Sequence, residues 1–167
     1  EWQRGTRADG ADSHGVGLAG PDHWDVRMIV SVLSSAPKDF SSRDGMKLTQ
    51  QTAPFYPGWL ATVERDLAVC RAAIASRDLE ALGEAAEASA MKMHGCMLGA
   101  RPPFTYFQPA TIAVMHAVWD LRRQGVPAWM TIDAGPNVKV LTSPEAQATV
   151  EATLRAVAGV EDLIACA

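Results

Sequence analysis

The sequence predicts an α+β fold in which helices cover one face of an antiparallel sheet. The expected elements run in the order strand, three helices, two strands, helix and strand, which is not the regular alternation of a doubly wound fold. Apolar residues make up 48% of the 167 residues, enough for one domain with a sizeable core. A turn between two apolar runs near residue 135 adds the expectation of a hairpin.

The chain opens with a loop and a strand. Residues 3–25 contain Pro21 and glycines at 5, 10, 15, 17 and 20 among polar residues, which is loop composition. Residues 27–33, RMIVSVL, form a short apolar run and predict a buried strand. Residues 34–52 are polar and rich in turn-forming residues, so we expect no element there.

Three helices follow. The first is expected over residues 56–76, where apolar side chains recur at spacings of three and four, at Leu60, Val63, Leu67, Cys70 and Ile74. The second covers residues 79–98, which are rich in the strong helix formers Ala and Glu. The third begins at Pro109 and ends before Gly125.

The remaining elements are a hairpin, a helix and a strand. Residues 128–141 read AWMTIDAGPNVKVL, two apolar runs joined by a Gly-Pro turn, which predicts a hairpin. Ser143 and Pro144 predict an N-cap and the first turn of a helix that ends at Gly159. Residues 163–166 are expected to form a last short strand.

The net charge and the cysteine pattern argue against several classes of protein. A net charge of −4 gives no reason to expect nucleic acid or an anionic membrane as a partner. Cys70, Cys96 and Cys166 are widely spaced without a C-x-x-C pair, so neither a disulfide framework nor a zinc site is expected. We expect them to be buried hydrophobes in a reducing compartment. No apolar run approaches the ~18 residues of a membrane span, and we expect a cytoplasmic protein.

Asp133 is the first candidate for chemistry. The apolar run before it ends abruptly on this carboxylate, and the turn follows. A lone acid at the tip of a hairpin that lines a cleft is placed as a general base would be. The alternative is a solvated turn aspartate, which the local pattern alone favours.

A second candidate is the group Ser41, Ser42 and Arg43. It combines hydroxyl donors with a planar guanidinium, a combination that suits phosphate. Taken alone, a solvated turn or a helix N-cap is the strongly favoured interpretation. Lys38 and Lys47 flank the group and add positive charge, although a solvated lysine is the simpler interpretation of each.

Four stretches in the same order resemble the mevalonate diphosphate decarboxylases. They are residues 9–13 (DGADS), 38–46 (KDFSSRDGM), 93–94 (MH) and 133–139 (DAGPNVK), and the resemblance runs from Trp2 to about Leu141. It implies a ferredoxin-like antiparallel sheet with helices on one face, the C-terminal domain of a GHMP-kinase-type fold. That family is considerably longer than this chain. We therefore expect residues 1–26 to be a loop and strand remnant of an N-terminal domain, and residues 27–167 to form the C-terminal domain.

The resemblance also implies a reaction. The intact enzyme, a carbon–carbon lyase, would use ATP to phosphorylate the tertiary hydroxyl of mevalonate 5-diphosphate, and decarboxylation would yield isopentenyl diphosphate. Asp133 would be catalytic and would accept or orient the hydroxyl proton, whereas Ser42 and Arg43 would bind the substrate diphosphate. ATP and Mg2+ would be held mostly by an N-terminal half, without a metal site here. A homodimer is implied.

Two other functions stay open. One is a paralogous kinase or decarboxylase of a related hydroxy acid, and the other is a non-catalytic ferredoxin-like module for binding or dimerisation. The resemblance assigns no chemistry to Asp9, Asp12 or His94, for which we expect structural roles as loop caps and as a hydrogen-bonded histidine. This chain alone should be inactive, because no G-x-x-x-x-G-K-[ST] or comparable phosphate-binding loop is found in it.

Overall fold

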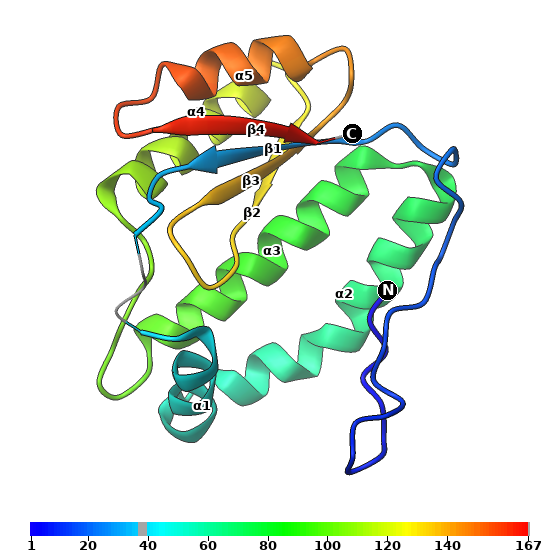
Figure 1. Cartoon of the computed structure of the whole chain (residues 1–167), viewed down its shortest axis with the longest axis vertical. Coiled ribbons are helices and arrows are strands. Elements are labelled where there is room, and N and C mark those ends of the chain that lie inside the picture. Colours follow the sequence, from blue (N-terminus) through cyan, green and yellow to red (C-terminus); the bar gives the residue numbers. More distant parts are fainter. Residues whose placement is uncertain (37–39, 167) are drawn as a thin grey trace.

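A four-stranded antiparallel sheet forms the centre of the computed structural model, which describes residues 1–36 and 40–166 (Figure 1). The strands are β1 (Arg27–Val32), β2 (Ala128–Thr131), β3 (Val138–Thr142) and β4 (Asp162–Cys166), in the order β2-β3-β1-β4. The predicted α+β class, the hairpin and the last strand are confirmed, because β2 pairs with β3 and β1 pairs with both β3 and β4, all antiparallel.

Five helices accompany the sheet: α1 (Ser42–Thr52), α2 (Tyr56–Ser76), α3 (Leu79–Leu98), α4 (Pro109–Arg123) and α5 (Gln147–Arg155). The bounds predicted for α2 and α3 are confirmed, as is the start of α4 at Pro109. The predicted bounds of α5 were wrong at both ends. Ser143 accepts a hydrogen bond from the Ala146 backbone N–H at 3.3 Å in a turn that precedes α5, and the helix ends at Arg155 rather than Gly159.

Helix α1 was missed by the sequence analysis. Its buried positions are Gly45 and Thr49 rather than large apolar residues, so the row of large apolar side chains that usually reveals a helix is missing. The side chain of Ser41 caps it by accepting a hydrogen bond from the Asp44 backbone N–H at 3.1 Å. The start of α1 is therefore specified by a cap and by close packing.

Helices α4 and α5 cover one face of the sheet. Their buried side chains form the main core with inward-facing strand residues, including Val114, Val118, Leu154, Ile29 and Val140. The opposite face is only partly covered: Val30 is half-buried and Ile164 on β4 is 51% exposed. The sheet thus has a covered face and an open face, which agrees with the prediction of helices on one face.

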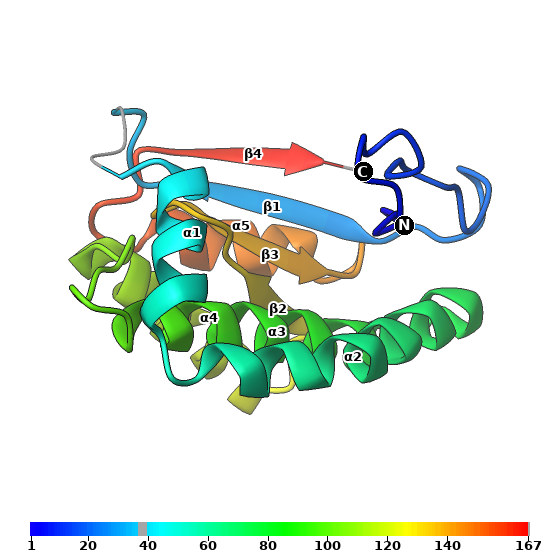
Figure 2. The same ribbon diagram turned by 90° about the horizontal axis from the view of Figure 1, so that it is seen from below.

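Helix α3 lies along the outer edge of β2, and α2 packs against α3 farther from the sheet (Figures 1 and 2). Contact between α3 and β2 is close, because a Cβ on Gly83 would stand 2.2 Å from Cγ of Trp129. Glu87 of α3 accepts hydrogen bonds from the backbone N–H of Met130 and from Arg122 of α4. The free edge of β2 is thereby covered.

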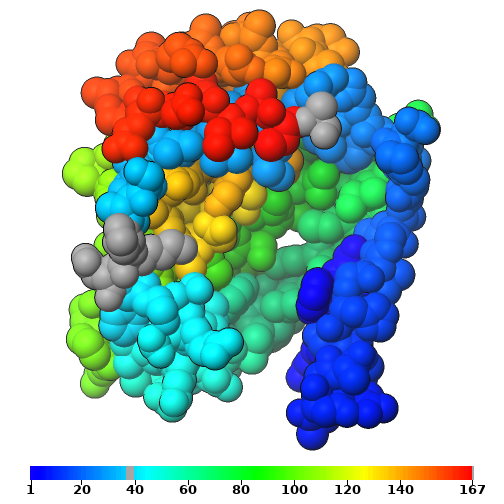
Figure 3. All heavy atoms as spheres, viewed as in Figure 1, coloured from blue at the N-terminus to red at the C-terminus, as the bar shows by residue number. Residues whose placement is uncertain are grey.

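Residues 1–26 form an irregular segment beside α2 (Figure 1). Glu1 pairs with Arg71 at 2.6 Å, and the His23 ring lies 2.7 Å from the Ile74 carbonyl oxygen. In Figure 3 the surface is hollowed between this segment, α1, α2 and the strands. The division of the chain at residue 26 stays a prediction.

None of the described helices is long and apolar enough to cross a membrane. The three cysteines are free. Cys96 is buried as expected, but Cys70 is only half-buried and Cys166 is exposed, so the expectation of three buried cysteines was wrong. The outward position of Cys166 follows from its place at the end of the edge strand β4.

Candidate functional site

Asp133 lies directly after β2, where the chain turns toward β3. Its side chain is 72% exposed and forms an ion pair with Lys139, with 2.6 Å between Oδ1 and Nζ. The hairpin register places Lys139 opposite Thr131, so the lysine of one strand reaches the acid that follows the other. Because the acid lies at the surface, the pair contributes only about 0–1 kcal/mol to stability.

The backbone of this turn is more firmly held than its side chain. Hydrogen bonds reach it from α3, from α4 and from the end of β1: His94 with the Ile132 carbonyl (3.2 Å), Thr111 with the Pro136 carbonyl (2.9 Å), and the backbone N–H of Leu33 with the Asn137 side chain (2.8 Å). Because these contacts flank Asp133 on both sides, the acid is an exposed group on a fixed backbone.

His94 lies beneath the turn and is 2% exposed. Burial lowers the pKa of His94, although the Ile132 carbonyl and the Asp133 carboxylate act in the opposite direction. The imidazole is therefore a neutral buried group near neutral pH. A hydrogen-bonded structural histidine was expected, and the bond to Ile132 agrees with that expectation.

Ser42 and Arg43 are the first two residues of α1, and both are exposed. We expected them in a loop, and that was wrong. The cap at Ser41 starts a helix because its side chain satisfies a backbone N–H that would otherwise lack a partner. The helix N-terminus carries a partial positive charge that favours anions. Among the described residues, none forms an ion pair with Arg43.

Three charged residues lie near Ser42 and Arg43 in the sequence. Lys38 lies outside the described residues. Lys47 is exposed on α1, as expected of a solvated lysine. Asp44 sits in the first turn and accepts a hydrogen bond from Ser41 at 2.6 Å, so one carboxylate opposes the positive field at this helix end.

The turn and α1 lie side by side. Figures 1 and 2 both place the loop between β2 and β3 next to α1. Tyr106 fixes the start of the helix by donating its hydroxyl proton toward the Phe40 and Ser41 carbonyls, at 3.3 and 3.2 Å. This arrangement is compatible with a shared cleft for Ser42, Arg43 and Asp133, which stays a prediction.

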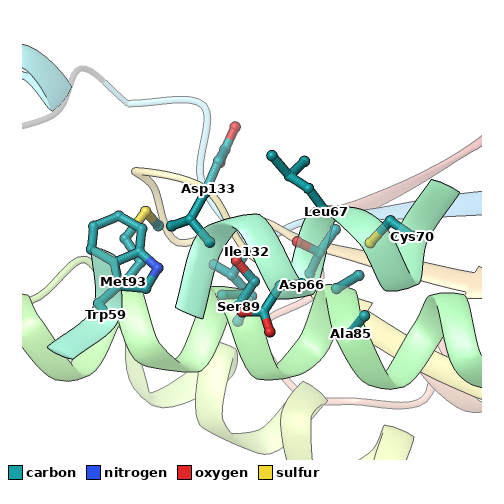
Figure 4. A pocket seen from close by; sticks show the side chains of 13 residues that line it. Trp59, Asp66, Leu67, Cys70, Ala85, Ser89, Met93, Ile132 and Asp133 are labelled. Carbon is teal, nitrogen blue, oxygen red and sulfur yellow. The ribbon is translucent and has the colours of Figure 1, made fainter. Parts of the chain in front are cut away.

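A groove of about 420 Å3 runs between α2 and α3 and ends at Asp133 (Figure 4). Its walls are largely apolar and include Trp59, Leu67 and Met93. In Figure 4 the carboxyl end of Asp133 points away from α3. A molecule that reaches the acid would therefore contact an apolar wall on one side and the lysine-bearing open face of the sheet on the other.

Three acids outside the hairpin have partners of their own. Asp66 in the groove wall pairs with Lys92; burial alone would raise the pKa of Asp66, but hydrogen bonds from Lys92 and Thr62 hold it below its usual value. Asp12 accepts the backbone N–H of Thr6 at 2.7 Å. Arg7 lowers the pKa of Asp9 to about 2. These two acids act within their own loop, as expected of structural caps.

Within residues 1–36 and 40–166, no group of three His, Cys, Asp or Glu side chains could hold a metal ion. The part of the chain that the structure describes therefore offers magnesium no cage of its own. Lys139 is the site residue that the sequence analysis did not single out. Its signal was the hairpin itself, because pairing the two apolar runs across the connection at residues 132–137 brings a residue of the second run back beside the acid.

Comparisons with known proteins find relatives along most of this chain. Residues 28–166 match the family model "Mevalonate 5-diphosphate decarboxylase C-terminal domain". The diphosphomevalonate decarboxylase of Aspergillus fumigatus is 30% identical over 163 residues, which are 95% of this chain and 40% of the fungal protein. The chain thus spans well under half of that relative.

Two solved structures are similar over nearly the whole chain. The crystal structure of mevalonate diphosphate decarboxylase from Staphylococcus aureus superposes with a TM-score of 0.89 at 35% identity, and 98% of this chain covers 49% of that one. A structure described as "MDDEF in complex with MVAPP, AMPPCP and Magnesium" gives a TM-score of 0.86 at 37% identity, with 98% of this chain covering 50% of it.

Proposed function

The chain belongs to the family of mevalonate 5-diphosphate decarboxylase C-terminal domains, and from this we propose that it is part of an ATP-dependent decarboxylase. The whole enzyme converts mevalonate 5-diphosphate to isopentenyl diphosphate and releases ADP, phosphate and CO2. The observation that carries the proposal is the similarity, over 98% of this chain, to a protein in complex with MVAPP, AMPPCP and magnesium.

In this proposal Asp133 handles the proton of the substrate's tertiary hydroxyl. That hydroxyl is a poor leaving group, whereas its phosphate ester leaves readily, and departure leaves positive charge that loss of the carboxylate as CO2 quenches. Asp133 accepts or orients the proton as the oxygen attacks phosphorus. Its exposure and its fixed backbone support this role, because a general base must reach the substrate in a defined geometry.

Ser42 and Arg43 bind the diphosphate end of the substrate. The exposed guanidinium and hydroxyl at the N-terminus of α1 support this assignment, since both the side chains and the helix end favour an anion. Anchoring the diphosphate at a distance from the reacting carbon uses remote binding energy to orient the hydroxyl toward Asp133.

ATP supplies the phosphoryl group, and magnesium neutralises its charge when bound. The described residues provide no metal cage, and in this proposal most magnesium ligands belong to an N-terminal half. The same proposal includes that half as a partner, residues 1–26 as part of its boundary, a homodimeric assembly and a cytoplasmic location.

The test uses the full-length protein and this chain in parallel. With mevalonate 5-diphosphate and ATP, the full-length protein should release CO2 and ADP in equal amounts, and the 167-residue chain should release neither. Release of ADP without CO2 would favour a kinase of a related hydroxy acid. Absence of both from the full-length protein would reject the proposal, and CO2 release by the chain alone would reject its dependence on an N-terminal half.

A further inference from the structure

His94 is a buried polar group in contact with the turn that carries Asp133. Its Nε2 lies 3.2 Å from the carbonyl oxygen of Ile132, the residue directly before the acid. The ring packs on Phe107, with 4.3 Å between ring centroids and 35° between planes. Packing and the hydrogen bond together therefore fix the imidazole between α3 and the end of β2.

The imidazole brings one polar atom that this space does not satisfy. Within the described part of the chain, Nδ1 of His94 is buried without a hydrogen-bond partner, and a buried unsatisfied polar atom costs about 1–3 kcal/mol. Phenylalanine would keep the contact with Phe107 and avoid that cost. The imidazole offers one thing that phenylalanine lacks, a donor for the Ile132 carbonyl. That bond requires the proton on Nε2 and leaves Nδ1 bare.

The hydrogen bond from His94 to the Ile132 carbonyl affects Asp133, because it holds the residue directly before the acid. The carboxylate is exposed and pairs with Lys139 at the surface, so its position depends on the backbone that carries it. Thr111 and Asn137 hold the far side of the turn at Pro136 and at the end of β1. His94 holds the near side, one residue before the acid.

On the basis of the proposed function, we infer that His94 is a positioning residue for the decarboxylase reaction. It does not touch the substrate; it fixes the backbone of Ile132 so that Asp133 presents its carboxylate at the distance that proton transfer needs. A displacement of about 1 Å in such a group costs up to about 100-fold in rate. Loss of this hydrogen bond should therefore lower kcat more than it raises KM.

The chain contains a matched control at the opposite end of the same hairpin. The hydroxyl of Thr142, which is fully buried, donates to the Pro127 carbonyl at 2.6 Å, just before β2 begins. Thr142→Val removes that bond while keeping the shape, and it lies at the end of the hairpin remote from Asp133. Both changes loosen one end of β2, but only one acts beside the acid.

The experiment compares His94→Phe, His94→Gln and Thr142→Val in the full-length enzyme. We expect His94→Phe to lower kcat for mevalonate 5-diphosphate by about 10- to 100-fold with KM within about threefold. His94→Gln, which can donate to the carbonyl, should recover part of that loss. Thr142→Val should lower the melting temperature and leave kcat within about twofold of wild type. A folded His94→Phe enzyme with wild-type kcat, or equal losses in His94→Phe and Thr142→Val, would overturn the inference.

Two further measurements test the inference if His94→Phe does not fold or if activity alone is ambiguous. If His94→Phe does not fold, His94→Met replaces it as a flexible variant without a donor, and a kcat equal to that of His94→Gln overturns the inference. Hydrogen exchange of the 131–137 backbone amides, measured by mass spectrometry, needs no substrate. It should quicken in His94→Phe and not in Thr142→Val. Inactive wild-type enzyme would reject the proposed function, while unchanged exchange would reject the positioning role.

Discussion

The two halves of the proposed site are held in different ways. The turn around Asp133 is tied to α3, α4 and the end of β1, and the acid has an ionic partner in Lys139. Ser42 and Arg43 stand exposed on the first turn of α1. The difference matches their proposed tasks: proton handling requires a fixed geometry in the transition state, whereas an anchor for a diphosphate acts through ground-state attraction.

The largest expected effect comes from Asp133→Asn. The amide keeps the shape but lacks the basic oxygen, so kcat should fall by ~10²- to 10⁴-fold while KM changes little. The measurement is CO2 release at saturating ATP in the full-length enzyme. Asp120→Asn is the matched control, since Asp120 is also exposed and paired with a neighbouring cation, Arg123. Near-normal kcat for Asp133→Asn would remove the acid from the mechanism.

Arg43→Ala should act on binding instead. Loss of a charge-assisted contact of about 1.5–3 kcal/mol predicts a KM for mevalonate 5-diphosphate about 10- to 100-fold higher, with kcat largely kept. Arg43→Lys should recover only part, because the ammonium lacks the planar fork of the guanidinium. Lys47→Ala, exposed on the same helix, serves as the control. If Arg43→Ala abolished kcat and spared KM, the division of labour drawn above would be wrong.

Gly45→Ala tests whether diphosphate binding by Ser42 and Arg43 depends on the packing position of α1. A Cβ at this position would lie 2.7 Å from the Tyr106 hydroxyl oxygen and 3.1 Å from the Phe104 ring, so the helix must shift. We expect a stability loss of about 1–3 kcal/mol and a KM several-fold higher, with kcat nearly unchanged. Gly95→Ala is the control because nothing lies within 4 Å of its added Cβ. An unchanged KM would show that the anchor tolerates movement of its helix.

Lys139→Met, which removes the ionic partner of Asp133, should lower kcat by less than Asp133→Asn does. The pair contributes about 0–1 kcal/mol to stability, so the melting temperature should change little. We expect kcat to fall a few-fold, because the carboxylate loses the partner that orients it. Lys139→Arg should retain the pair and the rate. A loss as large as that of Asp133→Asn would instead give Lys139 a direct role at the substrate.

The smallest effect concerns pH and His94. Because burial holds the pKa of His94 below the ordinary 6.5, the unfolded chain binds the proton more readily than the folded one. The free energy of unfolding should therefore fall as pH drops below about 6.5. Asp133 of the turn is the charged group that faces the ring and moderates the shift. Urea unfolding between pH 7 and pH 5 should show a shallower decline in His94→Phe; equal slopes would contradict the prediction.

The sequence was most informative where burial is periodic. The bounds of α2 and α3 followed from regular apolar spacing and from Ala-rich composition. Helix α1 was missed because Gly45 and Thr49 form its buried side. The packing that selects Gly45 comes from Phe104 and Tyr106, far along the chain. Lys139 was missed because its partner is defined by strand register rather than by local sequence.

The sequence alone identified the candidate site residues, but it did not reveal the tertiary contacts that hold them in place. Asp133 was expected at a hairpin turn, and it lies there. The contacts that fix it, from His94 and Thr111, join residues 38 and 25 positions apart. Such contacts arise from tertiary packing, which a single sequence does not display. The shared cleft with Ser42 and Arg43 stays a prediction for the same reason.

The hairpin also determines where this domain can change length. Lys139 stands between Val138 and Val140, both fully buried. Because side chains alternate between faces, one residue added within 132–137 and absorbed as a shift of β3 would turn the lysine into the core and a valine to the open side. Insertions in that turn therefore damage the core and the ion pair together. Tolerated insertions should collect instead in the exposed, glycine-rich segment 3–25.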